Sequence, residues 1–313
     1  MEKIEYKHFI TSEKKEQERE DERTGNKDLK KFQDYVIKNQ GKIEKLLNSG
    51  KALDDIFYQD FYNCDIDKLK YEENIPGFQE MKENYNREIE NLYKDFTENK
   101  KNFPENIEVW RRDKWFGANI NGGPEIKDMG RLYFNLEPFL LPDFFRQSVE
   151  EFSSKNLHIQ IKIFSKANAD EFNRFDKMVL YFNEKEEKPV LELVKKLYWK
   201  NITSFKNKVP HFTLKIKGDG GGVMEGISFG QETDIKNQSF GSIRSKILAE
   251  VYAEAEKEKL SIDNPEFNIN ESFRKACEEY KVDPKQPAFN LLRKRLGILK
   301  SEEKFPEIRK IGV

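Results

Sequence analysis

The sequence predicts an α+β fold, in which an antiparallel or mixed sheet is flanked by helices and preceded by a helical N-terminal region. Three patterns predict this fold. Before residue 100, apolar residues recur at steps of three and four, which is typical of helices that bury one face. After residue 129, short segments alternate apolar and polar residues, which is typical of strands. A long helical pattern, beginning at Ser239, follows the last predicted strand.

The chain divides into three predicted parts. Residues 1–31 are expected to be a disordered or frayed arm, because residues 12–31 form a run of mixed charge with a single apolar residue. Residues 32–104 are expected to be a helical N-terminal subdomain without obvious chemistry, and residues 105–313 the α+β domain. Helices of the subdomain are predicted over residues 32–47, 53–69 and 78–96.

Pro104 marks the beginning of the α+β domain, and residues 106–125 are predicted to be a loop region because Gly, Asn and Pro interrupt them. The glycines at 220–222 favour a tight turn or bulge, since no P-loop motif surrounds them. Strands are predicted over residues 130–136, 157–163, 178–182 and 211–217, and helices over 143–153, 190–198, 239–259 and 272–280.

Composition argues against several partners. The chain has 313 residues and a formal net charge of −1, without a block of Lys and Arg that acids leave unrelieved. Nucleic-acid binding needs phosphate neutralisation, so no nucleic-acid partner is expected. The longest apolar patch, residues 139–145, contains Pro142 and Asp143 and cannot span a bilayer. No membrane partner is expected either, whereas 25 Phe and 12 Tyr can build a core.

Cysteine and histidine usage argues against a transition metal held by the protein. The two cysteines, Cys64 and Cys277, are far apart, and His8, His158 and His211 lie in no zinc-binding motif. Both cysteines are interpreted as structural thiols in a reducing compartment. The expected localisation is the cytoplasm, or a host cell to which the protein is exported.

Lys162 is the first candidate for chemistry. It alternates with Ile161 and Ile163, so it stands in mid-strand on the face opposite the aliphatic residues. Arg174 follows twelve residues later, and the pair fits a site for an anionic substrate. Most strand lysines simply face water, so the residues alone leave both interpretations open.

Arg244 is the second candidate. It falls in the first turns of the predicted helix that begins at Ser239, where the helix dipole favours anions. A phosphate or carboxylate there would meet backbone N–H groups and a guanidinium, but an ion pair with Glu250 or Asp234 explains it equally well. His211 equally fits a surface or packed position, and Trp110, Trp115 and Phe116 are interpreted as packing residues.

Several short motifs, in a fixed order between Ile126 and Asn290, resemble the HopA-type effector family. The relatives of that family include the lyases of class V lanthipeptide and thioamitide biosynthesis, which in turn resemble, distantly, the phosphothreonine lyases of the OspF/SpvC type. The first hundred residues lie outside the resemblance. The motifs are GRLYFNL, IKIFS, FDKMVLY, VPHFTLKI, SFGSIR and VDPKQPAFN, of which SFGSIR and the D-P-x-x-P-x-x-N turn are the most specific.

The resemblance implies a phosphothreonine-lyase-like fold and β-elimination of phosphate from phosphothreonine or phosphoserine in a peptide or protein. Lys162 would remove the α-proton as a neutral amine, which burial and neighbouring guanidinium groups favour. Neither a metal nor a cofactor would be needed. The residues expected to bind the phosphate are Arg131, Arg174, Arg244 and Lys215.

The resemblance leaves the acid open. The phosphothreonine lyases supply a histidine acid from the strand before the lysine, but the corresponding GRLYFNL segment has no histidine. Tyr133 occupies the position, with Arg131 beside it, and His211 is the alternative donor from another strand. A third possibility is that the activity is altered or lost.

The leading hypothesis is therefore a phosphopeptide lyase that works beside a separate kinase on a precursor peptide, or acts on a host phosphoprotein as an effector served by a secretion chaperone. An ADP-ribosyltransferase is a second hypothesis, with Arg131 on an early strand and Gln231 and Glu232 as the catalytic pair. A third is a non-catalytic domain that binds a phosphopeptide or a chaperone.

Overall fold

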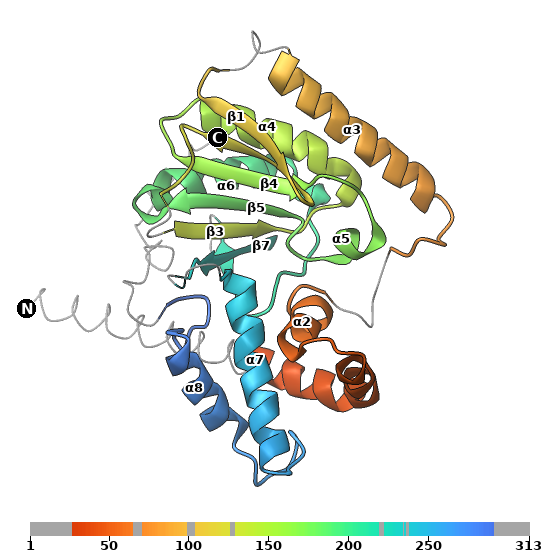
Figure 1. Cartoon of the computed structure of the whole chain (residues 1–313). Coiled ribbons are helices and arrows are strands. Elements are labelled where there is room, and N and C mark those ends of the chain that lie inside the picture. Colours follow the sequence, from red (N-terminus) through yellow and green to blue (C-terminus); the bar gives the residue numbers. More distant parts are fainter. Residues whose placement is uncertain are drawn as a thin grey trace, which may run out of the picture.

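A seven-stranded antiparallel sheet is the centre of the molecule (Figure 1). The computed structural model describes residues 27–64, 71–98, 104–125, 129–218, 222–233, 235 and 238–290. The strand order is β1-β2-β4-β5-β3-β7-β6. The strands are β1 (Ile107–Arg112), β2 (Trp115–Ile120), β3 (Met129–Phe134), β4 (Ile159–Phe164), β5 (Met178–Asn183), β6 (Leu214–Lys217) and β7 (Val223–Gln231).

One face of the sheet packs against three helices. Figure 1 shows α4 (Leu141–Ser153) and α6 (Glu187–Lys200) behind the sheet, with α3 (Phe78–Glu98) beyond β1. The aliphatic residues of β4 point into this core and are fully buried, as their alternation predicts. The polar alternates of β4 consequently stand on the opposite face.

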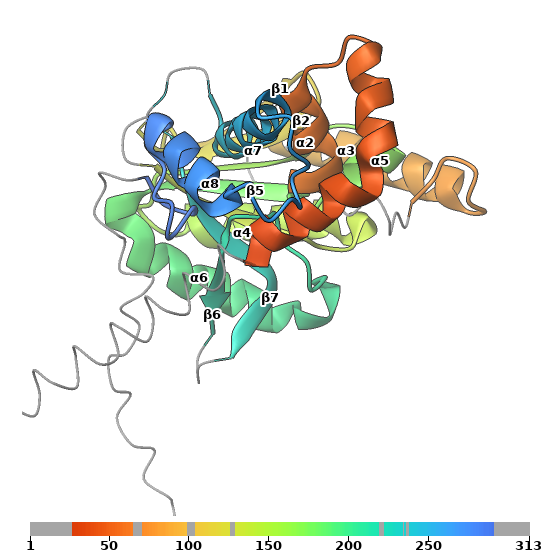
Figure 2. The same cartoon turned by 90° about the horizontal axis from the view of Figure 1, so that it is seen from below.

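A second core joins the two ends of the described chain. Residues 27–48 are helical and pack with α7 (Phe240–Lys257) and α8 (Ile269–Glu279), below the sheet in Figure 1 and nearer the viewer in Figure 2. Between them lie α2 (Leu53–Phe57) and the π-helical turn η1 (Tyr58–Tyr62). We call this assembly the helical lobe. Its largest apolar members include Phe32, Phe57, Phe61, Ile247, Leu248 and Phe273.

The two cores do not follow the boundary of the predicted subdomain of residues 32–104. α3 joins the sheet, whereas residues 27–64 share a core with helices from the C-terminal part. The first helix also includes residues 27–31 of the predicted arm, of which Asp28 and Leu29 are buried. Residues 1–26 of the arm, 65–69 of the second predicted helix and 291–313 lie outside the described residues, as do Gly220 and Gly221.

Two strand predictions were wrong. Residues 107–120 form the hairpin of β1 and β2 instead of a loop, because the hairpin pairs with β4 and the glycine inside it is covered by a tryptophan. His211 to Thr213 do not belong to β6, since Phe212 adopts a left-handed φ of 61° and turns the chain. β7 was not predicted, because Gly226 and Gly230 interrupt its pattern.

The remaining predicted elements are confirmed within one to three residues at most ends. The Ser239 side chain caps α7 by accepting a hydrogen bond from the Ser242 amide, as predicted. Among the described residues, no helix is both long enough and apolar enough to cross a bilayer.

Candidate functional site

Lys162 and Tyr133 stand in one row across the face opposite α4 and α6. Lys162 of β4 pairs with Val179 of β5, and Val179 pairs with Tyr133 of β3. Adjacent strands lie about 4.8 Å apart, so about 10 Å separates the α-carbons of Lys162 and Tyr133. Paired residues point to the same side of a sheet. Lys162 and Tyr133 therefore stand on either side of Val179, which is buried with Tyr133 in the cluster that Tyr62 joins.

The Lys162 amine is surrounded by aromatic rings. Its Nζ lies 4.3 Å from the ring centroid of Trp115 and 5.1 Å from that of Tyr181. In the described ranges, no carboxylate forms an ion pair with Lys162, although the side chain is only partly exposed. Cation–π contacts position the amine without neutralising it. Lys162 is thus held in place by two aromatic rings, and its amine also interacts with the Tyr181 hydroxyl.

Tyr181 lies on this face between β3 and β4, and it was not predicted as a site residue. It pairs with Gln160 on β4 and with Arg131 on β3, whose guanidinium carbon lies 4.7 Å from its ring centroid. Burial acts to raise the pKa of Tyr181, but the charges of Arg131 and Lys162 outweigh it and the pKa is lowered. Tyr181 lies two residues after Val179, so the period of a strand puts both on one face, and this was the available signal.

Tyr133 occupies the predicted acid position in a buried environment. Its hydroxyl accepts a hydrogen bond from Nη1 of Arg131 at 3.2 Å, and only 2% of the residue is exposed. Burial raises the pKa of Tyr133 to about 12, against the lowering effect of Arg131. The hydroxyl is therefore protonated at neutral pH, and its own hydrogen is not used in the bond with Arg131.

Arg131 is compensated by an internal carboxylate. Its Nη2 forms an ion pair with Glu232, which directly follows β7. The Arg131 Nε has no hydrogen-bond acceptor among the described residues, although it is fully buried. Buried guanidinium groups normally have all their N–H groups satisfied. Arg131 thus has one donor left for a ligand.

Arg174 is also paired with a carboxylate. It lies at the C-cap of α5 (Ala169–Asn173) and binds Asp176 through two bonds, of 2.8 Å from Nε and 2.9 Å from Nη2. Nη2 also lies 3.2 Å from the Tyr58 hydroxyl. Next to Asp176, the buried Lys177 donates hydrogen bonds to the Asn135 side chain and the Arg174 carbonyl. Arg174 was predicted to bind phosphate, but its guanidinium already binds the Asp176 carboxylate.

Two tyrosines from the helical lobe cover this part of the sheet. Tyr58 and Tyr62 of η1 are stacked, with ring centroids 5.7 Å apart. Tyr62 is buried with Tyr133, Val179, Tyr181 and Phe240, and Tyr58 packs against that cluster. The extra residue per turn of a π-helix displaces side chains from the register of an α-helix, and such turns are frequent at functional sites. The N-terminal residues, predicted to lack chemistry, therefore contribute to the candidate site.

Arg244 is buried at the beginning of α7, with 1% of its surface exposed. Its guanidinium lies 3.7 Å over the Phe240 ring, and Nε and Nη2 donate to the Pro287 carbonyl at 2.9 and 2.6 Å. Burial lowers the pKa of Arg244 to about 10. The bonding partner is thus a backbone carbonyl of the D-P-x-x-P-x-x-N segment and not Glu250, while Asp234 lies outside the described residues. Nη1 has no acceptor among the described residues.

The structure does not bring His211 and Lys215 to Lys162. His211 Nδ1 lies 3.1 Å from Asp28, and the ring stacks on Phe61 with centroids 4.4 Å apart, so its contacts belong to the helical lobe. Lys215 of the edge strand β6 pairs with Ser228, which pairs with Tyr133, so Lys215 lies two strands beyond Tyr133. It is exposed, with Nζ 3.6 Å from Glu225. Neither side chain is hydrogen-bonded to Lys162 or Tyr133.

Gln231 and Glu232, the pair of the ADP-ribosyltransferase hypothesis, are used in structural bonds. Gln231 donates to Glu184 at 2.6 Å and accepts from the Asn290 amide at 2.8 Å. Asn290 also donates to the Glu232 carbonyl, while the Glu232 carboxylate binds Arg131. These bonds fix the segment that holds Arg244, and they leave Glu232 without the unpaired carboxylate that this chemistry needs.

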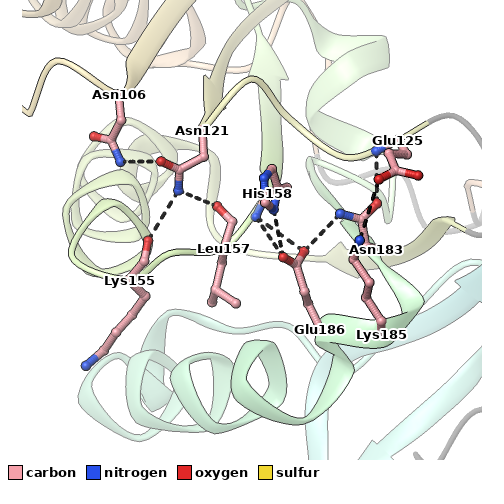
Figure 3. A network of polar contacts seen from close by, with 9 residues as sticks. All are labelled: Asn106, Asn121, Glu125, Lys155, Leu157, His158, Asn183, Lys185 and Glu186. Carbon is pink, nitrogen blue, oxygen red and sulfur yellow. Dashed lines mark hydrogen bonds and ion pairs between the residues drawn. The ribbon is translucent and has the colours of Figure 1, made fainter.

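His158 lies in a separate network at the ends of β2, β4 and β5 (Figure 3). Its Nδ1 is 2.8 Å from Glu186, which also accepts a hydrogen bond from Asn183 at 3.1 Å. Asn121 donates to the Leu157 carbonyl at 2.8 Å and fixes the beginning of the same strand. The network is structural, since four residues of strand, about 13 Å, separate His158 from Lys162. No three His, Cys, Asp or Glu side chains in the described part of the chain gather around a potential metal position.

The comparisons agree with the fold and name its family. The structure of the effector protein from Pseudomonas syringae pv. syringae strain 61 is similar to this chain with a TM-score of 0.55 and 15% identity, over 86% of this chain and 98% of that one. This similarity concerns the fold. The HopA1 effector protein family model matches residues 113–289, and the chain belongs to this family.

Two further solved structures are more distant. The effector protein from Pseudomonas syringae pv. tomato strain DC3000 has a TM-score of 0.49 at 13% identity, over 83% of this chain and 99% of that one. The phosphothreonine lyase SpvC, the effector protein from Salmonella, has a TM-score of 0.31 at 8% identity, over 49% of this chain and 89% of that one. No curated protein sequence matches the chain.

Proposed function

We propose that this protein is a lyase that eliminates phosphate from phosphothreonine or phosphoserine in a peptide or protein. The observation that carries the proposal is the row of Lys162, Val179 and Tyr133, in which an amine and a protonated phenol face each other across a single residue. A β-elimination needs a base at the α-carbon and an acid at the leaving oxygen of the same substrate residue. This row supplies both from rigid strands.

The proposed reaction proceeds as follows. The neutral Lys162 amine takes the proton from the α-carbon, and that electron pair forms the double bond between the α- and β-carbons. The bond between the β-carbon and the phosphate oxygen breaks, and the oxygen takes the Tyr133 hydroxyl proton. The products are inorganic phosphate and a dehydrobutyrine or dehydroalanine residue. No electrons are gained or lost overall, so no redox partner is required.

Two arginines bind the phosphate in this proposal. Arg131 and Arg244 each have one buried N–H group without an acceptor among the described residues, and both lie against the aromatic cluster of Tyr133 and Phe240. Phosphate oxygens are strong acceptors for guanidinium groups. Arg174, which Asp176 holds, contributes through its position beside Tyr58 and through its charge.

The test is a reaction with a phosphothreonine peptide, followed by mass spectrometry and by a phosphate assay. The expected result is release of phosphate together with a peptide that has lost the elements of phosphoric acid. Lys162→Ala should abolish this conversion, while Lys166→Ala, an exposed lysine beyond β4, should leave it unchanged. Hydrolysis to unmodified threonine, or an active Lys162→Ala variant, would contradict the proposal.

A second candidate function is phosphopeptide binding without turnover. It is favoured by the ion pairs of Arg131 with Glu232 and of Arg174 with Asp176, which compensate the site internally. It predicts tight binding of intact phosphopeptide and no release of phosphate, so the same experiment separates the two. As a member of an effector family, the protein would act on a phosphoprotein in a host cell, after export with a chaperone. The alternative setting is peptide maturation beside a separate kinase.

A further inference from the structure

The row that contains Tyr133 and Lys162 continues onto the β1–β2 hairpin. Lys162 pairs with Gly117 of β2, and Gly117 pairs with Trp110 of β1. Trp115 stands on the same face, one pair further along, beside the Lys162 amine. We call Trp110, Trp115 and Arg112 the hairpin platform. The candidate base therefore lies at the border between a covered half of the face and this platform.

Gly117 allows one indole to lie across the strand. A β-carbon at position 117 would be 2.7 Å from Cε2 of Trp110 and 2.8 Å from the Ile161 carbonyl oxygen. The Trp110 Nε1 donates to the Asn119 side chain at 3.2 Å, and Gln160 donates to the same oxygen at 3.0 Å. Trp110 is thus fixed flat against the sheet by packing and by a hydrogen bond.

Trp115 is fixed by stacking. Its ring lies 4.8 Å from that of Phe164, with 23° between the planes. Neither Trp110 nor Trp115 is buried, in contrast to Phe116 on the other face. The prediction that both tryptophans are ordinary packing residues therefore does not account for their exposure. Rigid, partly exposed indoles are typical of residues that bind a partner.

The platform carries positive charge that is not compensated. Arg112 is exposed, with its guanidinium 5.9 Å over the Trp110 ring, and no described carboxylate forms an ion pair with it. Lys162 likewise forms no ion pair with a carboxylate of the described residues. The carboxylate on this face, Glu108, hydrogen-bonds Asn119 at 3.3 Å. The covered half differs, because Glu232 and Asp176 there hold the arginines.

We propose that the hairpin platform binds the peptide segment next to the phosphorylated residue, and that it selects an aromatic or large aliphatic side chain there, with acidic residues beyond. The identity of the ligand rests on the proposed function. Charge complementarity with Arg112 and continuity with Lys162 both favour an acidic phosphopeptide as the occupant. The platform extends the site across the described sheet to its edge strand.

The strand spacing sets the position of the selected side chain. Lys162 and Trp110 are two strands apart, or about 10 Å, which an extended peptide covers in about three residues. The side chain that contacts Trp110 should therefore lie about three positions from the residue that loses phosphate. Peptides with Phe or Gly at that position, on either side of the phosphothreonine, test this distance.

Binding is measured first, independently of turnover. The chain has three tryptophans, so Trp199→Phe, far away on α6, leaves the platform indoles as the only ones. Adding the Phe-containing phosphopeptide to this variant should change its fluorescence and give a dissociation constant. Trp110→Ala should raise that constant about tenfold, as for an aromatic side chain that a bound partner covers, and Trp199→Ala should not. An unchanged constant for Trp110→Ala, or no binding to the parent protein, overturns the proposal.

Two further measurements separate the platform from folding and from the proposed function. Because Trp110→Ala could loosen the hairpin, Arg112→Glu provides an exposed second change, which should weaken binding of an acidic peptide severalfold and leave a neutral one unaffected. If Arg112→Glu leaves the affinity for the acidic peptide unchanged, or weakens the binding of both peptides equally, the platform is contradicted. In the elimination assay, Trp110→Ala should raise KM and leave kcat nearly unchanged. Selective binding without phosphate release supports the platform and contradicts the lyase.

Discussion

Arg131 of β3 and Glu232, the residue after β7, form an ion pair on the buried face of the sheet that carries Tyr133. Arg174 and Asp176 form a second pair nearby. Arg131 and Arg174 therefore both have a counterion within the protein. A phosphate that enters the site must share these arginines with the two carboxylates, so the apo protein is stable without an anion and sensitive to changes in either partner.

Glu232→Gln should make the protein depend on phosphate. The change leaves the Arg131 charge buried without compensation, which costs about 3–5 kcal/mol of unfolding free energy. Phosphate should then raise the melting temperature of the variant more than that of the wild type, which thermal denaturation measures. Glu271→Gln, in the exposed pair with Arg274, is the matched control and should have no such effect. Equal phosphate shifts in all three proteins would show that Arg131 does not bind the anion.

Lys162→Arg should be as inactive as Lys162→Ala. Arginine keeps the positive charge and the contacts with Trp115 and Tyr181, but it cannot act as a neutral base. Loss of a general base lowers a rate by about 10²–10⁴-fold. Phosphopeptide affinity should stay within a few-fold of the wild type in the Arg variant. Substantial activity of Lys162→Arg would assign the α-proton to another residue.

Tyr133→Phe should reduce elimination by about 10²–10⁴-fold, since the leaving oxygen loses its proton donor. The pH dependence provides an independent check. The pKa of Tyr133 is raised to about 12, so folding favours the neutral phenol. Its contribution to stability is complete below about pH 10, the value for an exposed tyrosine, and disappears as the pH rises towards 12. Unfolding free energies between pH 8 and 11 should therefore fall less steeply for Tyr133→Phe than for the wild type.

Asp28→Asn should loosen the helical lobe. The Asp28 carboxylate accepts the Phe212 amide at 2.7 Å and lies 2.8 Å from Lys31 and 3.1 Å from His211. Burial acts to raise the pKa of Asp28, but the bonds and charges of His211 and Lys31 outweigh it and the pKa is lowered. This contribution is present above about pH 4 and is lost as the pH falls. Acid titration of unfolding should be flatter for Asp28→Asn than for the exposed control Asp34→Asn.

Gly241→Ala should displace the tyrosines of η1. Alanine inside a helix is normally favoured over glycine by about 1 kcal/mol. A β-carbon at position 241, however, would lie 2.6 Å from ring carbons of both Tyr58 and Tyr62. The variant should lose stability and phosphopeptide affinity. Gly41→Ala, in the helix of residues 27–48 with no atom within 4 Å of the new carbon, is the control and should gain stability. A stabilised Gly241→Ala variant would mean that η1 moves aside freely.

Much of the fold follows from local patterns. The alternation in β3 and β4 predicted which residues face the helices, and it placed Lys162 and Tyr133 on the opposite side. The α+β class and the antiparallel sheet are confirmed. The β1–β2 hairpin was missed, because a glycine at position 117 favours a loop. In the structure the Trp110 indole fills the space where a side chain of residue 117 would stand.

The composition of the site depends on contacts between distant segments. The sequence did not single out Tyr58 and Tyr62, which η1 places against Gly241 of α7. Similarly, Arg244 was predicted to meet an anion or an acid, and its partner is a carbonyl 43 residues away. Pairing between such segments is set by tertiary packing, which local propensity does not encode.

The shared core of the helical lobe has a consequence for synthesis of the chain. The apolar stripe of the helix of residues 27–48, which includes Phe32, is buried by residues of α7 and α8, which a ribosome makes much later. During translation this stripe has no native partner, whereas the β1–β2 hairpin can form soon after it emerges. The nascent protein therefore exposes a hydrophobic surface at its N-terminal end for most of its synthesis. Such surfaces aggregate or recruit chaperones, and the final closure over Tyr133 and Lys162 has to wait for the C-terminal helices.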